Sequence, residues 1–315
     1  IYTLSLHDAL PIYELKLLKK IRRRFYYYGA FAASKMIFIL PYRFSVTSVS
    51  NAAGTLAYFF AVGARIKAKK NLRACFPEKT KKEINAITKN VFINQAKNFF
   101  ELANFPRMDS SFLKSISSIE NSHLIKEGIK KRKGILFVSA HTGNWEITAA
   151  AVADMGVAVN VVAKKIYIEE LNGMLVGYRN GKNVHVILRD APDTGRKLLR
   201  ALKRGEIIAM LIDQDTNVPG VFVDFFGRKA WTPSGLAVLA LKTGAEVLVG
   251  VDQRLDKFGH KTVVSGPLTI EPSGDFDKDV VALTQKASSV LEEHIRKYPE
   301  QWVWFHERWK TQKKD

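Results

Sequence analysis

The middle of the chain alternates short apolar runs with longer helix-like segments, and this alternation limits the folds that it can adopt. The apolar runs are rich in β-branched residues and too short for buried helices, so we predict strands at 134–140, 157–163, 184–188 and 207–212. Helices are predicted between them, from 144 onward, near 168–180 and at 193–204. Such alternation predicts an α/β fold, with a mixed central sheet flanked by helices on both faces.

The segments on either side extend this pattern without an internal repeat. Thr80-Lys81-Lys82-Glu83 has the spacing of a capping box, which predicts a helix that runs toward Leu102. Thr232-Pro233 has the composition of a cap and first-turn pair, which predicts a helix that ends at Gly244. Beyond it we predict a strand at 246–255, a hairpin partner at 261–265 and a last helix at 275–297.

Two apolar stretches with basic flanks, at 25–40 and 46–64, occupy the N-terminal region. A spanning helix needs about 20 predominantly apolar residues, and these stretches are only moderately hydrophobic, which favours an interfacial anchor or one tilted span. A helical hairpin packed on the core is the alternative. We therefore expect a membrane anchor at 13–70 and one large domain at 71–315. Residues 1–12 lack an initiator Met and resemble translated sequencing-adapter sequence, so we treat them as a non-native leader.

A histidine and a carboxylate lie five residues apart, at His141 and Glu146, where the strand at 134–140 passes into the next helix. Positions five apart on one helix point about 140° away from each other, so we expect His141 to precede the helix that Asn144 caps. From the carboxyl end of a strand, its imidazole can turn back toward Glu146. A neutral imidazole can take a proton from an alcohol, and a carboxylate on its other nitrogen fixes the tautomer. The alternative is a buried structural histidine beside a solvated acid.

The charge of the chain bears on its partners. Its 49 Lys and Arg against 30 Asp and Glu give a net charge of +19, which favours a polyanion such as nucleic acid, an anionic membrane or an acidic carrier. Nucleic acid is the poorer choice, because the chain has no zinc-finger spacing and no RNA-binding aromatic signature. Asp213 and Asp215 are too few ligands for a metal centre, and the single cysteine, Cys75, excludes an internal disulfide.

Several blocks of the sequence resemble one enzyme family. His141-Thr142-Gly143-Asn144-Trp145-Glu146 resembles the His-x4-Asp/Glu motif of the lysophospholipid acyltransferase superfamily, in the form found in the lipid A biosynthesis acyltransferases. Further similar blocks are Asn71–Glu78, Leu202–Glu206 with Leu211–Asp215, Gly220–Gly227 with Thr232–Gly235, and Trp302–Trp309.

This resemblance implies a function and a set of site residues. It implies an acyltransferase domain at 71–315, with His141 and Glu146 as the catalytic dyad, no cofactor and no metal. The donor would be acyl-acyl carrier protein, and the acceptor a hydroxyl of a Kdo-bearing, phosphorylated lipid A precursor. The candidate substrate-binding residues are Arg179, Arg189, Lys164, Asn144 and Asp213, although many relatives have arginine where this chain has Lys164. The implied location is the bacterial inner membrane, with the domain facing the cytoplasm.

Two other functions are compatible with the same sequence motifs. One is a superfamily member that acylates another membrane lipid, such as a phosphatidylinositol mannoside or a lysophospholipid. The other is a non-catalytic protein that binds anionic lipid through its basic flanks. Neither the chain length of the acyl group nor the choice between acyl carrier protein and coenzyme A follows from the sequence.

Overall fold

A seven-stranded mixed sheet, in the order β1-β9-β8-β2-β5-β3-β4, forms the centre of the protein. The computed structural model describes residues 23–24, 27–255 and 258–312. β8, β2, β5, β3 and β4 run parallel to one another, whereas β9 is antiparallel to β8 and carries β1 parallel beside it. The strands are β1 (Ser117–Glu120), β2 (Ile135–Ser139), β3 (Val159–Ala163), β4 (Val184–Leu188), β5 (Ile207–Leu211), β8 (Glu246–Arg254) and β9 (His260–Ser265).

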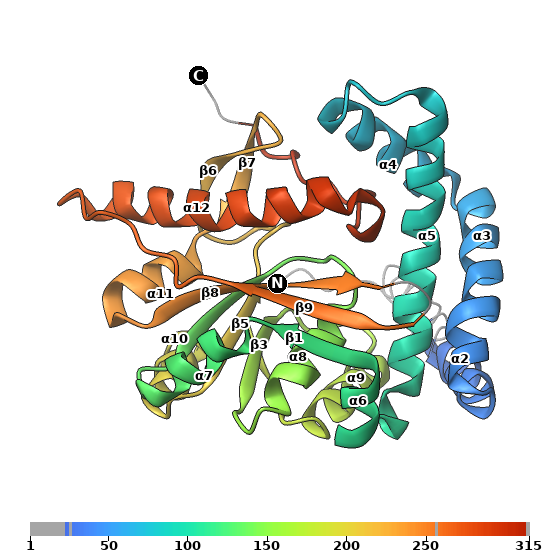
Figure 1. Cartoon of the computed structure of the whole chain (residues 1–315), viewed down its shortest axis with the longest axis horizontal. Helices are drawn as coiled ribbons and strands as arrows, with labels where there is room; N and C mark the ends of the chain where they lie inside the picture. Colours follow the sequence, from blue (N-terminus) through green and yellow to red (C-terminus); the bar gives the residue numbers. More distant parts are fainter. Residues whose placement is uncertain (1–22, 25–26, 256–257, 313–315) are drawn as a thin grey trace, which may run out of the picture.

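Helices cover both faces of this sheet, as predicted. Leu136 and Val138 of β2 pack with α10 (Thr194–Lys203), α11 (Gly235–Thr243) and α12 (Phe276–Lys297). Ile135 and Phe137 point the other way, toward α7 (Ser122–Lys130) and α8 (Trp145–Ala153). Figure 1 shows α11 and α12 on one side of the sheet, with α8 and α9 (Glu169–Asn180) on the other. Since both faces of β2 are covered, its residues form the continuous apolar run seen in the sequence.

A separate two-stranded hairpin, β6 (Gly220–Phe225) with β7 (Arg228–Pro233), corrects one prediction. Thr232 and Pro233 do not start a helix; they end β7, and α11 begins at Gly235 after Ser234. The hairpin turns through Phe226 and Gly227, which both have positive φ, as the tight turns of twisted hairpins require. Strand pairing with β6 therefore outweighs the local helix-start signal.

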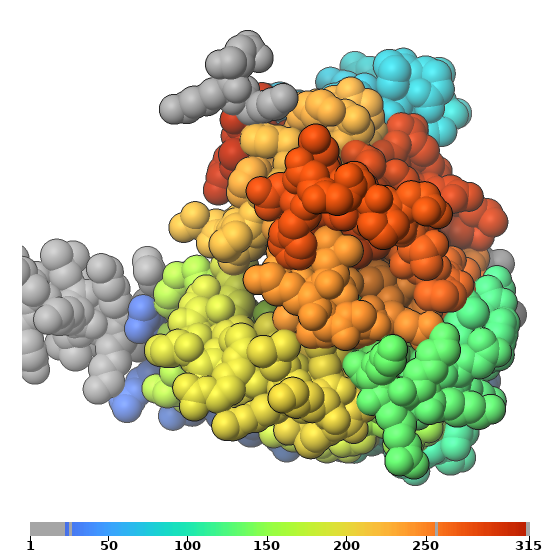
Figure 2. Space-filling view, turned by 90° about the vertical axis from the view of Figure 1, so that its left-hand side faces the viewer, coloured from blue at the N-terminus to red at the C-terminus, as the bar shows by residue number. Residues whose placement is uncertain are grey.

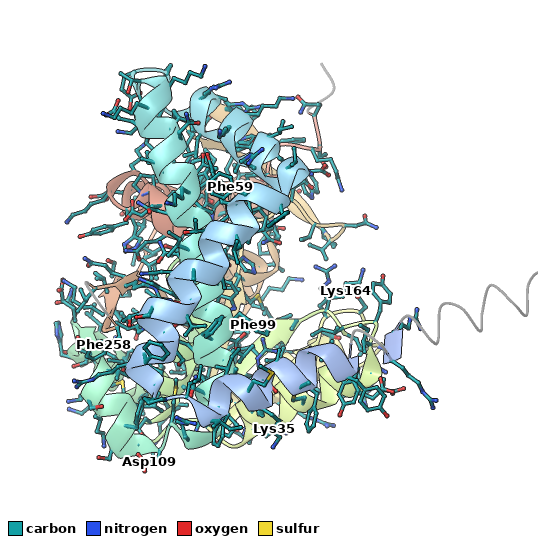
Figure 3. The ribbon with its side chains drawn as sticks, turned by 90° about the vertical axis from the view of Figure 1, so that its right-hand side faces the viewer. Lys35, Phe59, Phe99, Asp109, Lys164 and Phe258 are labelled. Carbon is teal, nitrogen blue, oxygen red and sulfur yellow. The ribbon has the colours of Figure 1, made fainter. Side chains whose placement is uncertain are left out.

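The N-terminal helices form one flank of the molecule (Figure 3). Residues 27–39 are helical, and the chain continues through α2 (Tyr42–Phe44), a π-helical turn (Ser45–Val49), α3 (Ser50–Phe60) and α4 (Val62–Cys75). α3 packs along α5 (Lys81–Asn104), whose predicted capping box is present. Two short 3-10 helices (Phe105–Arg107 and Pro299–Gln301) and α6 (Ser110–Ile116) complete the described elements.

The predicted membrane anchor is only partly within this flank. Its apolar side chains at Met36, Ile39, Phe59 and Phe60 are exposed. Within the described ranges, however, no helix combines the length and the apolar character that crossing a bilayer requires. The predicted leader at 1–12 and part of the basic flank lie outside the described residues.

Candidate active site

The register of two neighbouring strands brings His141 and Asp213 together. β2 and β5 are parallel, and Ser139 at the end of β2 lies opposite Leu211 at the end of β5. His141 and Asp213 each follow that pair by two residues, so both lie at the carboxyl edge of the sheet. This edge is where ligands bind in open parallel α/β sheets. We call residues 140–144, which join β2 to α8, the catalytic loop.

Asp213 accepts from three N–H groups, one of them on the His141 ring. Its Oδ1 lies 2.9 Å from His141 Nδ1, and its Oδ2 accepts from the His141 backbone N–H at 2.9 Å and from Trp302 Nε1 at 2.7 Å. Burial acts to raise the pKa of Asp213, but His141 and Trp302 outweigh it and hold that pKa well below its usual range. Because the ionised carboxylate only accepts, Nδ1 of His141 carries a proton, and the tautomer of the neutral ring is the one with its lone pair on Nε2. The ring is therefore set up to accept a proton at Nε2.

Glu146 has a different partner from the one that we predicted. Arg179 of α9 donates to it through Nε at 2.9 Å and Nη2 at 2.5 Å, and Trp145 Nε1 donates at 3.1 Å. The carboxylate on His141 Nδ1 is Asp213 and not Glu146, because strand register places Asp213 there while Glu146 sits in the first turn of α8. Glu146 and His141 nevertheless line the same cavity, on either side of Trp145, whose ring meets His141 edge-on at 4.8 Å.

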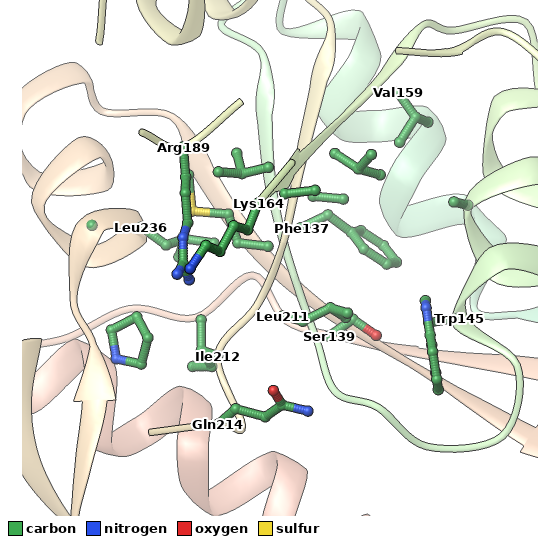
Figure 4. A pocket seen from close by; sticks show the side chains of 18 of the residues that line it. Phe137, Ser139, Trp145, Val159, Lys164, Arg189, Leu211, Ile212, Gln214 and Leu236 are labelled. Carbon is green, nitrogen blue, oxygen red and sulfur yellow. The ribbon is translucent and has the colours of Figure 1, made fainter. Parts of the chain in front are cut away.

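An apolar cavity of about 480 Å³ opens at this edge of the sheet (Figure 4). β3 and β5 pair only as far as Val161 and Ala209, so their carboxyl ends separate and leave a gap. The cavity lies along this gap and reaches side chains on both faces of the sheet. Those on the α8 face are Phe137, Val152, Val159, Val161, Ile207 and Ala209, and those on the other are Val162, Leu198, Met210, Ile212 and Leu236.

The predicted cationic residues meet at this cavity. Arg179, Lys164 and Arg189 all line it, and Figure 4 shows Lys164 and Arg189 extending their charged ends toward the same region. Arg179 is held by Glu146, whereas Arg189 has a single carboxylate neighbour in the described part of the chain, Asp190 at 3.4 Å. The cavity therefore combines an apolar interior with a group of cations.

Asn144 and Asp213 do not line the cavity, although we expected both to contact substrate. Asn144 is buried and caps α8 as predicted, because its Oδ1 accepts from the backbone N–H groups of Glu146 and Ile147. Asp213 is likewise buried behind His141. Asn144 therefore fixes the start of α8, and Asp213 fixes the His141 ring, without either of them lining the cavity.

The C-terminal segment supplies a contact that the sequence does not signal. Trp302 is fully buried among aromatic side chains, yet its indole N–H reaches Asp213. His306 stacks edge-on against Trp302 at 4.8 Å, and burial lowers its pKa to about 4. Asp215 accepts from the backbone N–H and the hydroxyl of Thr311, whereas Asp213 accepts from His141 and Trp302. An aromatic-rich ending gave no local sign of the Trp302 contact, because ordinary core packing has the same composition.

Comparison with known sequences assigns this chain to a family. The sequence pattern of the bacterial lipid A biosynthesis acyltransferase family matches residues 15–311. The chain belongs to this family. It is 24% identical over 266 residues to the lipid A biosynthesis palmitoleoyltransferase of Escherichia coli, with 82% of each chain covered. It is 25% identical over 249 residues to the lauroyltransferase of the same organism, covering 77% of this chain and 78% of the relative.

A second kind of relative is matched as well. The phosphatidylinositol mannoside acyltransferase of Mycolicibacterium smegmatis is 27% identical over 217 residues, which cover 66% of this chain and 67% of the relative. All three relatives are named as acyltransferases. The protein is therefore an O-acyltransferase of the lipid A acyltransferase family.

Proposed function

We propose that the protein transfers an acyl chain from acyl-acyl carrier protein to a hydroxyl of a Kdo-bearing lipid A precursor. The observation that carries this proposal is His141, with Nδ1 bound to buried Asp213, at an apolar cavity lined by cations. The cavity suits an acyl chain, and guanidinium and ammonium groups suit the phosphates of the acceptor.

The reaction follows from the state of His141. Nε2 takes the proton of the acceptor hydroxyl while the hydroxyl oxygen attacks the thioester carbonyl carbon. The tetrahedral intermediate then expels the carrier thiolate, which receives the proton from His141 as the ester forms. Asp213 keeps the proton on Nδ1 and stabilises the imidazolium that exists between these two steps. No acyl-enzyme is needed.

Glu146 and Arg179 act as a pair in this proposal. The two parallel hydrogen bonds fix the guanidinium plane of Arg179, which leaves its remaining N–H groups available to a phosphate or to the developing oxyanion. Lys164 and Arg189 supply further positive charge at the same cavity. Glu146 therefore contributes by orienting a cation and does not orient the imidazole.

We further propose that the protein works on the cytoplasmic face of the bacterial inner membrane. Exposed Ile39, Phe59 and Phe60 on the N-terminal helices, with basic residues on α4, support an interfacial anchor. Such an anchor would keep the domain at the surface where its lipid acceptor lies.

A second acceptor is supported by one comparison. The match to a phosphatidylinositol mannoside acyltransferase supports a glycosylated membrane lipid other than a lipid A precursor. The base and the cavity would serve either acceptor, since both offer a hydroxyl and a phosphate.

The test is mass spectrometry of lipid extracts after the membrane-bound protein has been incubated with mixed acyl-acyl carrier proteins. One sample receives a tetra-acylated lipid A precursor and another receives a phosphatidylinositol mannoside. We expect a gain of one acyl chain on the lipid A precursor, its loss in His141→Ala and its retention in His123→Ala, since His123 lies exposed on α7. Gain on the mannoside alone would favour the second acceptor. Lipid binding without any transfer by the folded wild type would refute both acceptors with this donor and would favour the non-catalytic function or another acceptor or donor.

A further inference from the structure

Four charged side chains are buried beneath the catalytic loop, and none of them lines the cavity. They come from three elements that are distant in sequence and none is more than 6% exposed. We call them the buried charge cluster: Glu101 of α5, Asp252 and Arg254 of β8, and His260 of β9.

The contacts within the cluster define its charges. Arg254 donates to both oxygens of Glu101, one of them at 2.8 Å. His260 lies between the two acids, with Nδ1 2.8 Å from Asp252 Oδ2 and Nε2 3.1 Å from Glu101 Oε1. Arg254 Nη1 also lies 3.4 Å from Nε2, but each ring nitrogen is closer to a carboxylate oxygen, so both carry hydrogen and the ring is an imidazolium. Two negative and two positive groups then balance.

The titration of His260 agrees with this geometry. Burial lowers its pKa, but Asp252 and Glu101 outweigh burial and raise it to about 9. Three other titratable groups face the cluster, namely Tyr42 of α2 and Lys97 of α5 near Glu101, and His294 of α12 near Asp252. Burial, in each case the largest cause, raises the pKa of Tyr42 and lowers those of Lys97 and His294. His260 is therefore the member of the cluster that changes charge at mildly alkaline pH.

The cluster holds the catalytic loop through its two acids. Asp252 Oδ2 accepts from the backbone N–H of Asn144 at 2.6 Å, and Glu101 Oε2 accepts from the Asn144 side chain at 2.7 Å. The contact is close, because a Cβ placed on Gly143 would lie 2.2 Å from Asp252 Oδ2. Asn144 is thus fixed between the cluster and the N-terminus of α8, which carries Glu146.

We propose that the buried charge cluster is a positioning element for the reaction, and that it works only while His260 is an imidazolium. This inference rests on the proposed function, because the geometry that it maintains is that of His141 relative to Glu146 and Arg179. Buried ion pairs are seldom the most stable way to fill a core, so stability alone does not explain the four charges. What they provide is two carboxylate acceptors in fixed directions. Neutral His260 has one N–H donor fewer, so one of the two carboxylates loses its hydrogen bond to the ring and can move together with Asn144.

The first test needs no substrate. The chain has seven histidines, so ¹³C labelling of histidine Cε1 gives few resonances, and His260→Gln identifies that of His260. We expect an imidazolium signal at pH 8 that titrates near pH 9. Titration near the ordinary value of 6.5 would overturn the proposal, whether or not acyl transfer is ever observed.

The second test uses Asp252→Asn. Among the described residues Asp252 Oδ1 has no hydrogen-bond partner, so an asparagine can place its amide nitrogen there and still accept from Asn144 with its oxygen. The contact to Asn144 is kept, and the negative charge beside His260 is lost. We expect kcat to fall at least tenfold, KM for both substrates to stay within twofold, and the alkaline fall of kcat to begin at least one pH unit lower.

The control is Val280→Ala in α12, whose buried side chain makes none of the hydrogen bonds or ion pairs that define the cluster, so that it lowers stability without removing one of them. An unmoved pH profile in Asp252→Asn, or a loss of kcat no larger than that of the control, would refute the positioning role. Should Asp252→Asn fail to fold, the wild type decides: its kcat must fall near pH 9 while its circular dichroism is unchanged, and a flat profile to pH 10 would refute the proposal. Absence of transfer by the wild type at every pH would refute the proposed function and leave the ¹³C titration to decide on the cluster.

Discussion

Asp213→Asn is the substitution that most directly tests how the base is prepared. Oδ2 of Asp213 accepts two N–H groups, from the His141 backbone and from Trp302, so the asparagine oxygen must occupy that position. Its NH₂ group then faces His141 Nδ1 across 2.9 Å and donates to it. Nδ1 must become the acceptor, the proton moves to Nε2, and the nitrogen that should take the hydroxyl proton is blocked.

The expected loss is large because the wrong tautomer removes general-base catalysis. We expect kcat to fall about 10³- to 10⁴-fold, equivalent to about 4–5 kcal/mol of transition-state stabilisation, with little change in KM. The assay is the initial rate of acyl transfer at saturating donor and acceptor, with circular dichroism as the test of folding.

Asp215→Asn is the matched control. Asp215 lies two residues away, and Thr311 is its one donor within the described ranges, where an asparagine can replace the carboxylate, so we expect at most a twofold change. A folded Asp213→Asn enzyme that keeps kcat within tenfold of the wild type would refute the assignment of Asp213 as the residue that fixes the tautomer.

Three further perturbations test other contacts. Arg179→Lys removes one of the two parallel hydrogen bonds to Glu146. We expect kcat/KM for a phosphorylated acceptor to fall about 30-fold, which corresponds to about 2 kcal/mol. An equal loss with a phosphate-free acceptor would contradict a phosphate-binding role. Gly143→Ala forces a left-handed φ of 54° and a clash with Asp252, so it should cost about 1–3 kcal/mol or more in unfolding free energy, measured by denaturant titration. An unchanged midpoint would show that the loop is not confined as described. The pKa of His260 rises from 6.5 to about 9 on folding, because its carboxylate neighbours outweigh the larger single effect of burial. Its contribution to stability is therefore complete below pH 6.5 and lost as pH rises through 9, by about 3 kcal/mol, and unfolding free energies that stay constant across this range would contradict it.

Local patterns predicted the elements that surround the site. The run of buried residues in β2 and the Asn144 cap of α8 are both present, because each depends on neighbours in the sequence. Thr232-Pro233 misled us because pairing with β6, which the local signal does not include, decides its conformation. The sheet class was therefore predictable, whereas one helix boundary was not.

The partners of the base were less predictable. Glu146 was the nearest carboxylate in the sequence, but the order of strands puts Asp213, 72 residues away, beside His141. Strand order depends on pairing between segments that are distant in the sequence, and the local hydrophobic periodicity carries no information about such pairing. A clearer signal existed for the buried charge cluster, since Glu101 stands between Phe100 and Leu102 and Asp252 directly follows the apolar part of β8. A lone charge within an apolar run indicates a buried partner without naming it.

The way in which Asp213 is held has a consequence for how the enzyme is made. His141 is translated before the residues that orient it. Asp213 follows β5, and Trp302, whose indole completes the set of donors to Asp213, lies near the end of the described residues. A nascent chain that has folded only as far as β4 has the catalytic loop but no group to hold the imidazole. The contacts that orient His141 are therefore complete only after Trp302 has left the ribosome, so a shorter nascent chain lacks the prepared imidazole on which the proposed reaction depends.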